Sequence, residues 1–353
     1  MGLQATLDVG EPKIECGHQP VDEATAGASW YPVWWPLVLP AVDLADRFDS
    51  RFLGFVMSKQ HHLDHTPFLV PPGKKVKLKD YDPEYTSGFK NKDEAKDALL
   101  DDVSDLAEAQ NVLWAAKEFA VVIVLQALDA AGKDGTIKHV MSGVNPQGVH
   151  VHSFKAPSDE ERLHHFLWRP TRALPARGEI AIFNRSYYEE VLVVRVHPAF
   201  LDSQWIPEQL SKDHKRLWKT RYEEINDFEA LSQRNNMIVL KFFLNVSKKE
   251  QRKRFLERLD NPEKNWKFSH ADVRERAHWD EYQDAYEDML SATSTEIAPW
   301  YVIPADKKWF TRACVADIIT RRIEKLGLKY PTVPESEQAA LAEARAKLEA
   351  EDD

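Results

Sequence analysis

The chain has 353 residues, of which 43% are hydrophobic and 29% charged, a composition typical of a soluble globular protein with a large core. Its formal net charge of −10 argues against a general nucleic-acid-binding protein, although it allows a local basic channel. The two cysteines, Cys16 and Cys314, lie too far apart for a metal or redox motif, which favours a reduced, cytoplasmic setting.

Residues 1–66 are predicted to form an N-terminal extension that is rich in Trp and Pro. The apolar stretch within it, residues 30–42, contains three prolines and is much shorter than a membrane span. No basic region precedes this stretch, as a signal peptide would require. The sequence therefore predicts neither a signal peptide nor a membrane anchor.

Beyond the extension, segments with helical periodicity alternate with short apolar runs. A helix over residues 93–119 places Leu99, Val103, Leu106 and Leu113 on one face. Strands separated by helices predict right-handed crossovers and a parallel sheet, and hence an α/β fold. The other predicted helices are 136–142, 158–168 (with a capping box from Ser158 and Glu161), 189–196 and 207–232; the strands are 121–125, 149–154, 180–183, 237–244 and 300–304.

The segment from Val121 to Ile137 is the most informative part of the chain. An apolar, β-branched strand enters a turn of small residues, and a helix is expected from about Thr136. This arrangement forms the phosphate cradle of P-loop enzymes, in which backbone N–H groups face the anion and a lysine, here Lys133, reaches the transferred phosphate. The other residues predicted to surround the phosphate or nucleotide are Ala130, Ala131, Gly132, Asp134, Gly135 and Thr136.

The loop departs from the pattern G-x-x-x-x-G-K-[ST] at two positions. Ala127 replaces the first Gly, and Asp134 replaces the Ser or Thr that would hold Mg²⁺. Asp129 offers a carboxylate oxygen that can bind Mg²⁺ in its place. The alternative for the loop alone is an ordinary strand–helix turn with a surface lysine.

A second motif follows the strand predicted over residues 180–183. Asn184, Arg185 and Ser186 lie where this strand ends, and the carboxyl ends of parallel strands line the ligand crevice of such a sheet. Arg185 is suited to clamp a phosphate, and Glu189 to bind a metal directly or through water. The alternative is a surface loop in which the Arg and the Glu simply pair with each other.

The chain resembles the polyphosphate kinase type 2 family, and more narrowly its class III branch. The resemblance spans roughly residues 70–330 and rests on motifs that occur in the same order in both. The motifs are Asp129-Ala-Ala-Gly-Lys-Asp-Gly-Thr-Ile-Lys-His-Val140, Val144-Asn-Pro-Gln-Gly148, Phe166-Leu-Trp-Arg169, Phe183-Asn-Arg-Ser-Tyr-Tyr-Glu189, Arg195-Val-His197, Asn265-Trp-Lys-Phe-Ser269 and Ala298-Pro-Trp-Tyr-Val302.

The resemblance implies a thymidylate kinase-like P-loop fold over residues 67–331 and transfer of phosphate from inorganic polyphosphate to nucleoside mono- and diphosphates. It also implies Mg²⁺, with Mn²⁺ as a substitute, a phosphate or nucleotide contact by Arg169, and a homodimer or homotetramer. The family pattern G-x-D-x-x-G-K-x-G is met except at Ala127. Many relatives carry Asp where Asn184 stands; Asn is similar to class III, with Glu189 as the substitute acid.

A basic helical lid is expected over about residues 247–280. In nucleotide kinases of this fold, such a lid closes over the phosphates and excludes water. A row of cations also favours a polyanion through counterion release. The alternative is a solvated charged face. The residues predicted to contact polyphosphate are Arg254, Arg258, Lys264 and Lys267.

Two other functions fit the same sequence. One is an ATP-dependent nucleoside monophosphate kinase, and the other is a polyphosphate-binding protein without catalysis. Residues 332–353 are predicted to be an acidic, Ala/Glu-rich tail. Because the family-like sequence begins only shortly after Met57, a further hypothesis is that native translation starts there.

Overall fold

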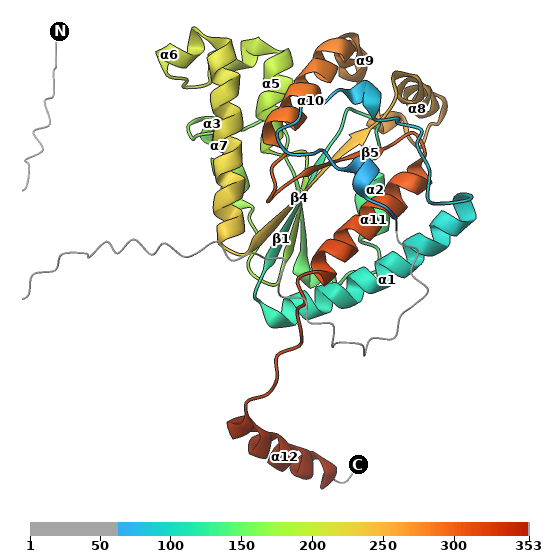
Figure 1. The fold of residues 1–353 in the computed structure, drawn as a ribbon, viewed down its shortest axis with the longest axis vertical. Coiled ribbons are helices and arrows are strands. Elements are labelled where there is room, and N and C mark those ends of the chain that lie inside the picture. Colours follow the sequence, from blue (N-terminus) through green and yellow to red (C-terminus); the bar gives the residue numbers. More distant parts are fainter. Residues whose placement is uncertain (1–62, 352–353) are drawn as a thin grey trace, which may run out of the picture. The chain divides into compact units, whose positions relative to one another are not determined.

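The computed structural model describes residues 63–351, which fold around a five-stranded, entirely parallel β-sheet (Figure 1). The strand order is β2-β3-β1-β4-β5. The strands are β1 Ala120–Gln126, β2 Val149–Ser153, β3 Ile180–Asn184, β4 Met237–Asn245 and β5 Trp300–Pro304. Every residue of β1 and β5 is buried, as expected of parallel strands that are covered on both faces.

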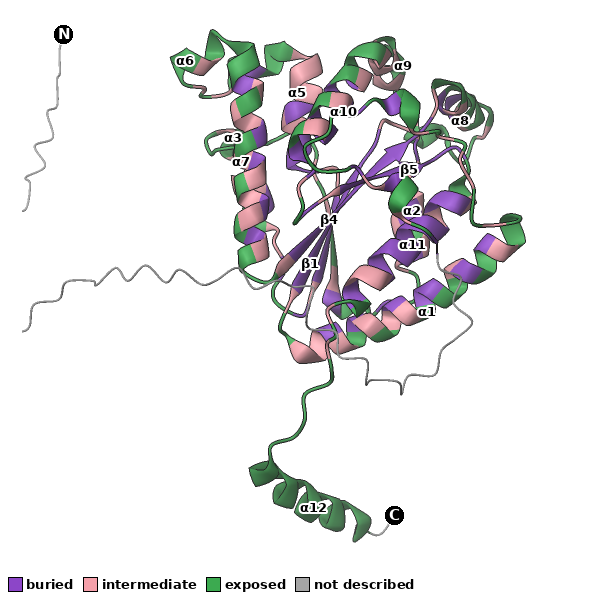
Figure 2. Cartoon of the chain, in the orientation of Figure 1, coloured by how far each residue is buried: buried purple, intermediate pink, exposed green. Residues whose placement is uncertain are grey.

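Helices cover both faces of this sheet. Val121 and Ile123 of β1 pack with α1, α2 and α11, whereas Val122 and Val124 pack with α7 and α10. In Figure 2 the strands are largely purple, the colour of buried residues, and the covering helices are green on their outer sides. These helices are α1 Lys92–Ala116, α2 Lys133–Val140, α7 His214–Arg234, α10 Trp279–Thr293 and α11 Lys308–Glu324.

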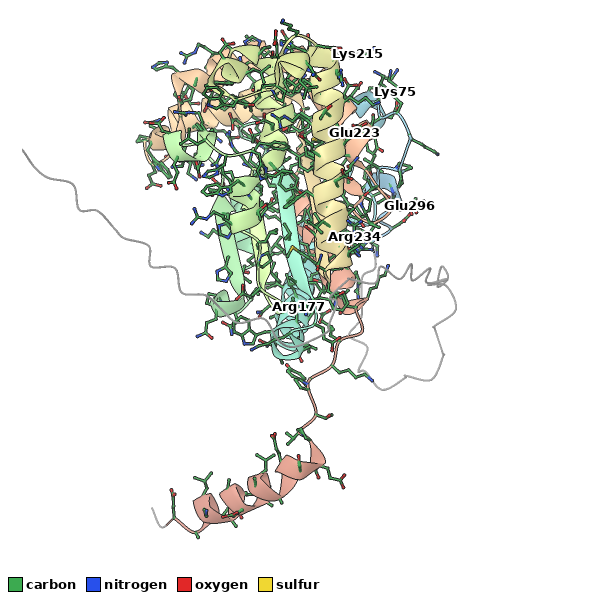
Figure 3. All side chains as sticks on the ribbon, turned by 90° about the vertical axis from the view of Figure 1, so that its left-hand side faces the viewer. Lys75, Arg177, Lys215, Glu223, Arg234 and Glu296 are labelled. Atoms are coloured by element: carbon green, nitrogen blue, oxygen red, sulfur yellow. The ribbon has the colours of Figure 1, made fainter. Side chains whose placement is uncertain are left out.

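Shorter elements complete the described chain. The α-helices are α3 Asp159–Arg162, α4 Trp168–Arg172, α5 Val193–Val196, α6 Glu208–Ser211, α8 Lys248–Asp260, α9 His270–Ala277 and α12 Glu335–Glu349; the 3₁₀-helices are η1 Thr66–Phe68, η2 Leu78–Asp80, η3 Pro146–Gly148, η4 Tyr187–Val191, η5 Pro198–Ser203 and η6 Asn265–Lys267. Figure 3 shows Lys215, Glu223 and Arg234 along the exposed side of α7. The opposite side of α7 buries Ile225 and Glu229.

The five predicted strands are all confirmed, each within one residue of its expected bounds. The helix after the loop starts at Lys133, earlier than the predicted Thr136, because Gly132 takes a left-handed φ of 116° and is the residue from which the helix begins. The helix predicted over residues 207–232 is divided into α6 and α7. Asp213 caps the start of α7 by accepting a hydrogen bond from Arg216 N at 3.0 Å.

The single helix predicted over residues 158–168 was wrong in length. Its capping box is present: Ser158 Oγ accepts from Glu161 N, and the Glu161 carboxylate accepts from Ser158 N. However, the helix ends at Arg162, and α4 begins at Trp168. Pro170 lies in the first turn of α4, where it is tolerated; inside one longer helix its ring would clash with the preceding turn.

The ends of the chain differ in how they relate to the sheet. Leu63 packs in the core of the domain, and His65 Nε2 lies 2.5 Å from Asp317 Oδ2 of α11, so residues before position 67 contact the domain. Most of the predicted extension, including Met57 and Cys16, lies outside the described residues. Every residue of α12 is exposed.

Among the helices of residues 63–351, none has the length and apolar character to cross a bilayer.

The topology fixes where a ligand can bind. The connection after β1 runs past β3 to β2, whereas the connection after β3 runs past β1 to β4, so the connections after these two neighbouring strands go in opposite directions. In open α/β sheets, such a switch point opens a crevice outside the carboxyl ends of the strands. The loop after β1 and the motif after β3 both lie at this end, because their strands are parallel neighbours.

The carboxyl group of Asp102, on the buried face of α1, makes stability depend on pH. Burial, reinforced by the charge of Asp317, raises the pKa of Asp102 from 3.8 to about 8, although Arg321 opposes the shift. Native Asp102 therefore keeps a proton that the unfolded chain releases above about pH 4, so the free energy of unfolding falls as the pH rises from there to about 8.

We expect Asp102→Asn, which cannot ionise, to gain stability relative to the parent protein between pH 5 and pH 8. Urea unfolding midpoints at the two pH values measure the effect. Asp101→Asn changes the exposed neighbour and is the matched control. An Asp102→Asn variant with the same pH dependence as the parent would contradict this prediction.

Candidate active site

A cavity of about 650 Å³ opens at the carboxyl ends of β1, β2 and β3. The loop after β1, the residues after β2 and β3, the start of α11, and α8 with the segment that follows it form its wall. Three acidic residues line it, against eight basic ones, so its electrostatic character suits a polyanion. The basic residues are Lys133, Lys155, Arg185, Arg254, Arg258, Lys264, Lys267 and Lys308.

The loop backbone explains why Ala127 can replace a glycine. The left-handed conformations in this loop occur at Ala130, with φ 62°, and at Gly132, with φ 116°, and not at Ala127. Ala127 therefore needs no glycine to adopt its backbone conformation. Ala130, by contrast, carries a Cβ in a conformation that L-residues avoid, a form of strain that is common at functional sites.

Lys133 is the first residue of α2, and its side chain turns back along the loop. Its Nζ donates to Ala127 O at 2.8 Å, and the residue is buried. Burial lowers the pKa of Lys133, whereas the neighbouring carboxylate of Asp129 opposes this shift. Lys133 thus lies in the cavity at a helix N-terminus, where anions are favoured, and its contact with a phosphate stays a prediction.

The end of β3 joins the loop through Arg185. The Arg185 backbone has a φ of 64°, and its N–H donates to Leu125 O of β1 at 3.1 Å. The guanidinium contacts both candidate metal ligands: Nη2 donates to Asp129 Oδ1 at 2.9 Å, and Nη1 lies 3.8 Å from Glu189 Oε2. The structure thus brings Asp129, Arg185 and Glu189 together.

Glu189 is held by its own neighbours. With the Gln126 amide oriented to satisfy its surroundings, the nitrogen donates to Glu189 Oε1 at 2.9 Å and the oxygen accepts from Ser186 N at 3.1 Å. Burial raises the pKa of Glu189, although the positive charges of Arg185 and Lys133 oppose the shift.

Asn184 and Asp134 pair across the mouth of the loop. Asn184 Nδ2 donates to Asp134 Oδ1 at 2.8 Å, so the end of β3 is tied to the first turn of α2. Thr136 donates its hydroxyl to Gly132 O at 3.2 Å and is buried within α2, so its hydroxyl is occupied by its own helix. Gly135 lines the cavity.

Arg254 is placed differently from the lid contact that the sequence suggested. Its side chain is buried, and its guanidinium donates to four backbone carbonyls. These belong to Ala130 and Ala131 of the loop and to Ala305 and Asp306 after β5, at 2.6–3.0 Å. The Nε also donates to Glu250 at 2.9 Å. Arg254 therefore supports the loop, and its N–H groups are engaged by protein.

The other predicted lid residues also line the cavity. Arg258 Nη1 lies 3.4 Å from Asp272 Oδ2 of α9. Lys264 and Lys267 are exposed and have no ion-pair partner within residues 63–351. Arg169 lies behind the wall: its Nη2 donates to Lys155 O at 2.9 Å.

Lys155 and Lys308 line the cavity but were not predicted from the sequence. Lys155 follows β2, and Lys308 follows β5 by four residues. A lysine just beyond the carboxyl end of a predicted strand is a signal that sequence reasoning could have used, as it did for Arg185. Glu257 of α8 also lines the cavity.

A divalent cation fits this donor set only with help from phosphates. Asp129 and Glu189 provide two carboxylates beside Lys133, and no group of three His, Cys, Asp or Glu side chains in the described chain is arranged to hold a metal. Mg²⁺ in nucleotide enzymes is commonly bound by one or two carboxylates together with substrate phosphates and water. The residues present therefore suit such an ion.

Comparison with known proteins agrees with this geometry. The family model described as polyphosphate kinase 2 matches residues 89–330. The chain is 47% identical over 281 residues to the ADP-polyphosphate phosphotransferase of Rhodopseudomonas palustris, covering 80% of this chain and 97% of the relative. It is 45% identical over 265 residues to the AMP/ADP-polyphosphate phosphotransferase of Meiothermus ruber, covering 75% and 94%.

Solved structures agree as well. The crystal structure of polyphosphate kinase 2 from Arthrobacter aurescens TC1 matches with a TM-score of 0.70 and 40% identity, over 78% of this chain and 95% of that one. The parallel sheet and flanking helices are therefore those of the P-loop kinase fold, as predicted. The chain belongs to the polyphosphate kinase 2 family and is a transferase.

Proposed function

We propose that the chain transfers the terminal phosphoryl group of inorganic polyphosphate to nucleoside mono- and diphosphates, taking AMP to ADP and ADP to ATP. The observation that carries this proposal is the strongly basic cavity into which the loop of a P-loop kinase opens. Such a row of cations favours a long polyanion as the donor. The two relatives with polyphosphate in their names support the same donor.

In the proposed reaction, an oxygen of the acceptor's terminal phosphate forms a new P–O bond to the terminal phosphorus of polyphosphate. The P–O bond to the rest of the donor breaks, and the shortened chain leaves with the electron pair. The acceptor oxygen is already anionic at neutral pH, so no side-chain nucleophile is required. Alignment and electrostatic stabilisation supply most of the acceleration.

The residues of the site divide this work. The backbone N–H groups of Ala130 and Gly132 make no hydrogen bond within residues 63–351. Together with the ammonium of Lys133, they hold the phosphate oxygens. Arg185 neutralises charge that spreads over the transferred phosphoryl group. The cations of the lid surround the donor chain and exclude water.

Nucleotide kinases generally use a divalent metal, and Asp129 and Glu189 are the residues that we propose hold Mg²⁺, or Mn²⁺ in its place. When bound, the ion neutralises charge on the donor and acceptor phosphates. Arg185 contacts both carboxylates and keeps them on one side of the loop.

The choice of acceptor is the finer part of the proposal. The relative from Meiothermus ruber is named for both AMP and ADP, which supports a class III-like enzyme that performs both steps; the relative from Rhodopseudomonas palustris is named for ADP alone. Asn184 has no carboxylate, and its amide donates to Asp134. Glu189 is therefore the residue that we assign as the second acid of the site. Use of GMP and GDP is a further proposal.

The test is nucleotide analysis after mixing the protein with Mg²⁺, long-chain polyphosphate and AMP, without ATP. We expect ADP first and then ATP. ADP alone would restrict the enzyme to the first step. Product only when ATP is the donor would identify an ATP-dependent monophosphate kinase, and no product with either donor would identify a binding protein.

We predict that Asp129→Asn raises the Mg²⁺ concentration for half-maximal rate by about tenfold or more, because the site loses one of its two proposed anionic ligands. A Mg²⁺ titration at saturating substrates measures this shift. Glu257→Gln removes one negative charge from the same cavity without touching Arg185, and is the matched control. Equal shifts in both variants would show a general charge effect instead.

A further inference from the structure

Gln251 connects the lid to the phosphate loop. This residue of α8 is only 3% exposed, and both ends of its amide are used. Its Nε2 donates to the backbone oxygen of Asp129 at 3.0 Å, and its Oε1 accepts from Arg276 Nη1 of α9 at 2.6 Å. A continuous chain of hydrogen bonds therefore runs from α9 through α8 to the loop.

Arg276 strengthens this chain. It has no carboxylate within ion-pair distance in the part of the chain that the structure describes, so its hydrogen bond to Gln251 joins a full positive charge to a neutral amide. A charged donor makes a shorter and stronger hydrogen bond than a neutral one. It also polarises the amide, which makes the Gln251 N–H a better donor to the Asp129 carbonyl.

The side chains of α8 hold three successive carbonyls of the loop. Gln251 binds that of Asp129, and Arg254 binds those of Ala130 and Ala131. In a trans peptide the C=O and the following N–H point in opposite directions, so the N–H groups of Ala130 and Gly132 are directed away from α8. Both residues line the cavity.

The Asp129–Ala130 peptide is the one that most needs such support. Ala130 follows it in a left-handed conformation, which a residue with a Cβ does not adopt without constraint. The carboxylate of Asp129 precedes it and contacts Arg185. A rotation of this peptide would turn the Ala130 N–H away from the cavity, and a shift of the backbone at Asp129 would move a candidate metal ligand.

We propose that Gln251 is a positioning residue through which lid helix α9 sets the orientation of the Asp129–Ala130 peptide. The chain Arg276–Gln251–Asp129 aligns the Ala130 N–H with phosphate and the Asp129 carboxylate with the metal only while α9 is in place. The inference rests on the proposed function, because that function assigns phosphate and metal to these groups. It makes catalysis depend on two residues that touch neither substrate.

The test compares Gln251→Leu, Gln251→Glu and Arg276→Met in the full chain. The readouts are kcat and KM for ADP with polyphosphate, and Mn²⁺ affinity with ADP present, followed by electron paramagnetic resonance. We expect Gln251→Leu to lower kcat and to weaken Mn²⁺ binding by about 10- to 100-fold, the usual effect of losing a group that orients a metal ligand. Gln251→Glu keeps the acceptor for Arg276 but loses the donor to Asp129. It should therefore lower kcat and weaken Mn²⁺ binding as Gln251→Leu does.

A double variant separates positioning from direct contact. Arg276→Met should weaken Mn²⁺ binding less than Gln251→Leu does, and should add nothing when combined with it, because Arg276 acts through Gln251. The control is Gln110→Leu. Gln110 of α1 is buried, as Gln251 is, but its amide has no hydrogen-bond partner within residues 63–351, so its loss should leave kcat and Mn²⁺ affinity unchanged.

Several results would overturn the inference. One is unchanged kcat and Mn²⁺ affinity in folded Gln251→Leu; another is a full additional effect of Arg276→Met in the double variant. If Gln251→Leu does not fold, Gln251→Glu, which has nearly the same shape, decides by the same readouts. A parent protein that fails to use polyphosphate would refute the proposed function, while the Mn²⁺ titration would still decide on the positioning role.

Discussion

Replacing Lys133 with alanine is expected to lower kcat by about 100- to 1,000-fold, the usual cost of removing one preorganised donor from developing negative charge. Lys133 lies against the loop backbone, where its Nζ donates to Ala127 O at 2.8 Å, and burial lowers the pKa of its ammonium, so we expect it to meet phosphate in a poorly solvated setting. Steady-state rates with polyphosphate and ADP measure the loss.

The fold of this variant should survive. Its principal structural loss is the hydrogen bond to Ala127 O, worth about 1 kcal/mol. Lys138→Ala, which removes an exposed lysine from the same helix, is the matched control and should keep nearly full activity. A well-folded Lys133→Ala protein with near-normal kcat would remove Lys133 from the mechanism.

Lys241→Met is expected to destabilise the protein by about 3–5 kcal/mol, because it leaves Glu229 as an unpaired buried charge. Lys241 lies in the central part of β4 and is completely buried. Its Nζ donates to Glu229 Oε2 at 2.6 Å, to Thr293 O at 2.6 Å and to Tyr188 Oη at 3.0 Å. The hydroxyls of Tyr187 and Tyr188 donate to Glu229 Oε1.

A double-mutant cycle isolates the ion pair within this network. Glu229→Leu alone should cost a similar amount, since it leaves Lys241 without its anion. Lys241→Met combined with Glu229→Leu should cost much less than the two added together, because no buried charge remains. Urea unfolding of the parent and the three variants at neutral pH gives the free energies of unfolding that the cycle compares. Strict additivity would contradict a coupled pair.

This network also bears on the site. Tyr187 and Tyr188 directly follow Arg185 and Ser186, so the hydrogen bonds to Glu229 anchor the segment that carries Arg185 and Glu189. The partial loss of stability expected above should therefore be accompanied by a loss of activity at temperatures where the variant is still folded.

The strands and the loop could be predicted because their signals are local. The β1 and β4 segments are mostly apolar, as parallel strands that are buried on both faces usually are, with Lys241 as the charged exception in β4. Arg185 could be placed because it directly follows β3, and Lys133 because it ends the loop that follows β1. The phosphate donor and the acceptors could be predicted only from the resemblance to the family's ordered motifs, because hydrophobic periodicity carries no information about substrates.

What the sequence did not reveal depends on contacts between distant segments. The charge of Arg254 is visible in the sequence, but its carbonyl partners after β5 are not. Residue type alone does not separate buried from exposed tryptophans: Trp300 is buried, but Trp205 is 89% and Trp266 is 77% exposed. A homo-oligomer, a cytoplasmic location and a translation start at Met57 stay predictions.

The position of Arg254 bears on how the enzyme should respond to ionic strength. The number of counterions that a bound polyanion displaces is set by the cations free to face it. Arg254 is matched by Glu250, and Arg258 faces Asp272. The lysines at 264, 267 and 308 line the cavity without an ion-pair partner in the described chain, so we expect salt sensitivity to reside in side chains that can be exchanged without disturbing the loop.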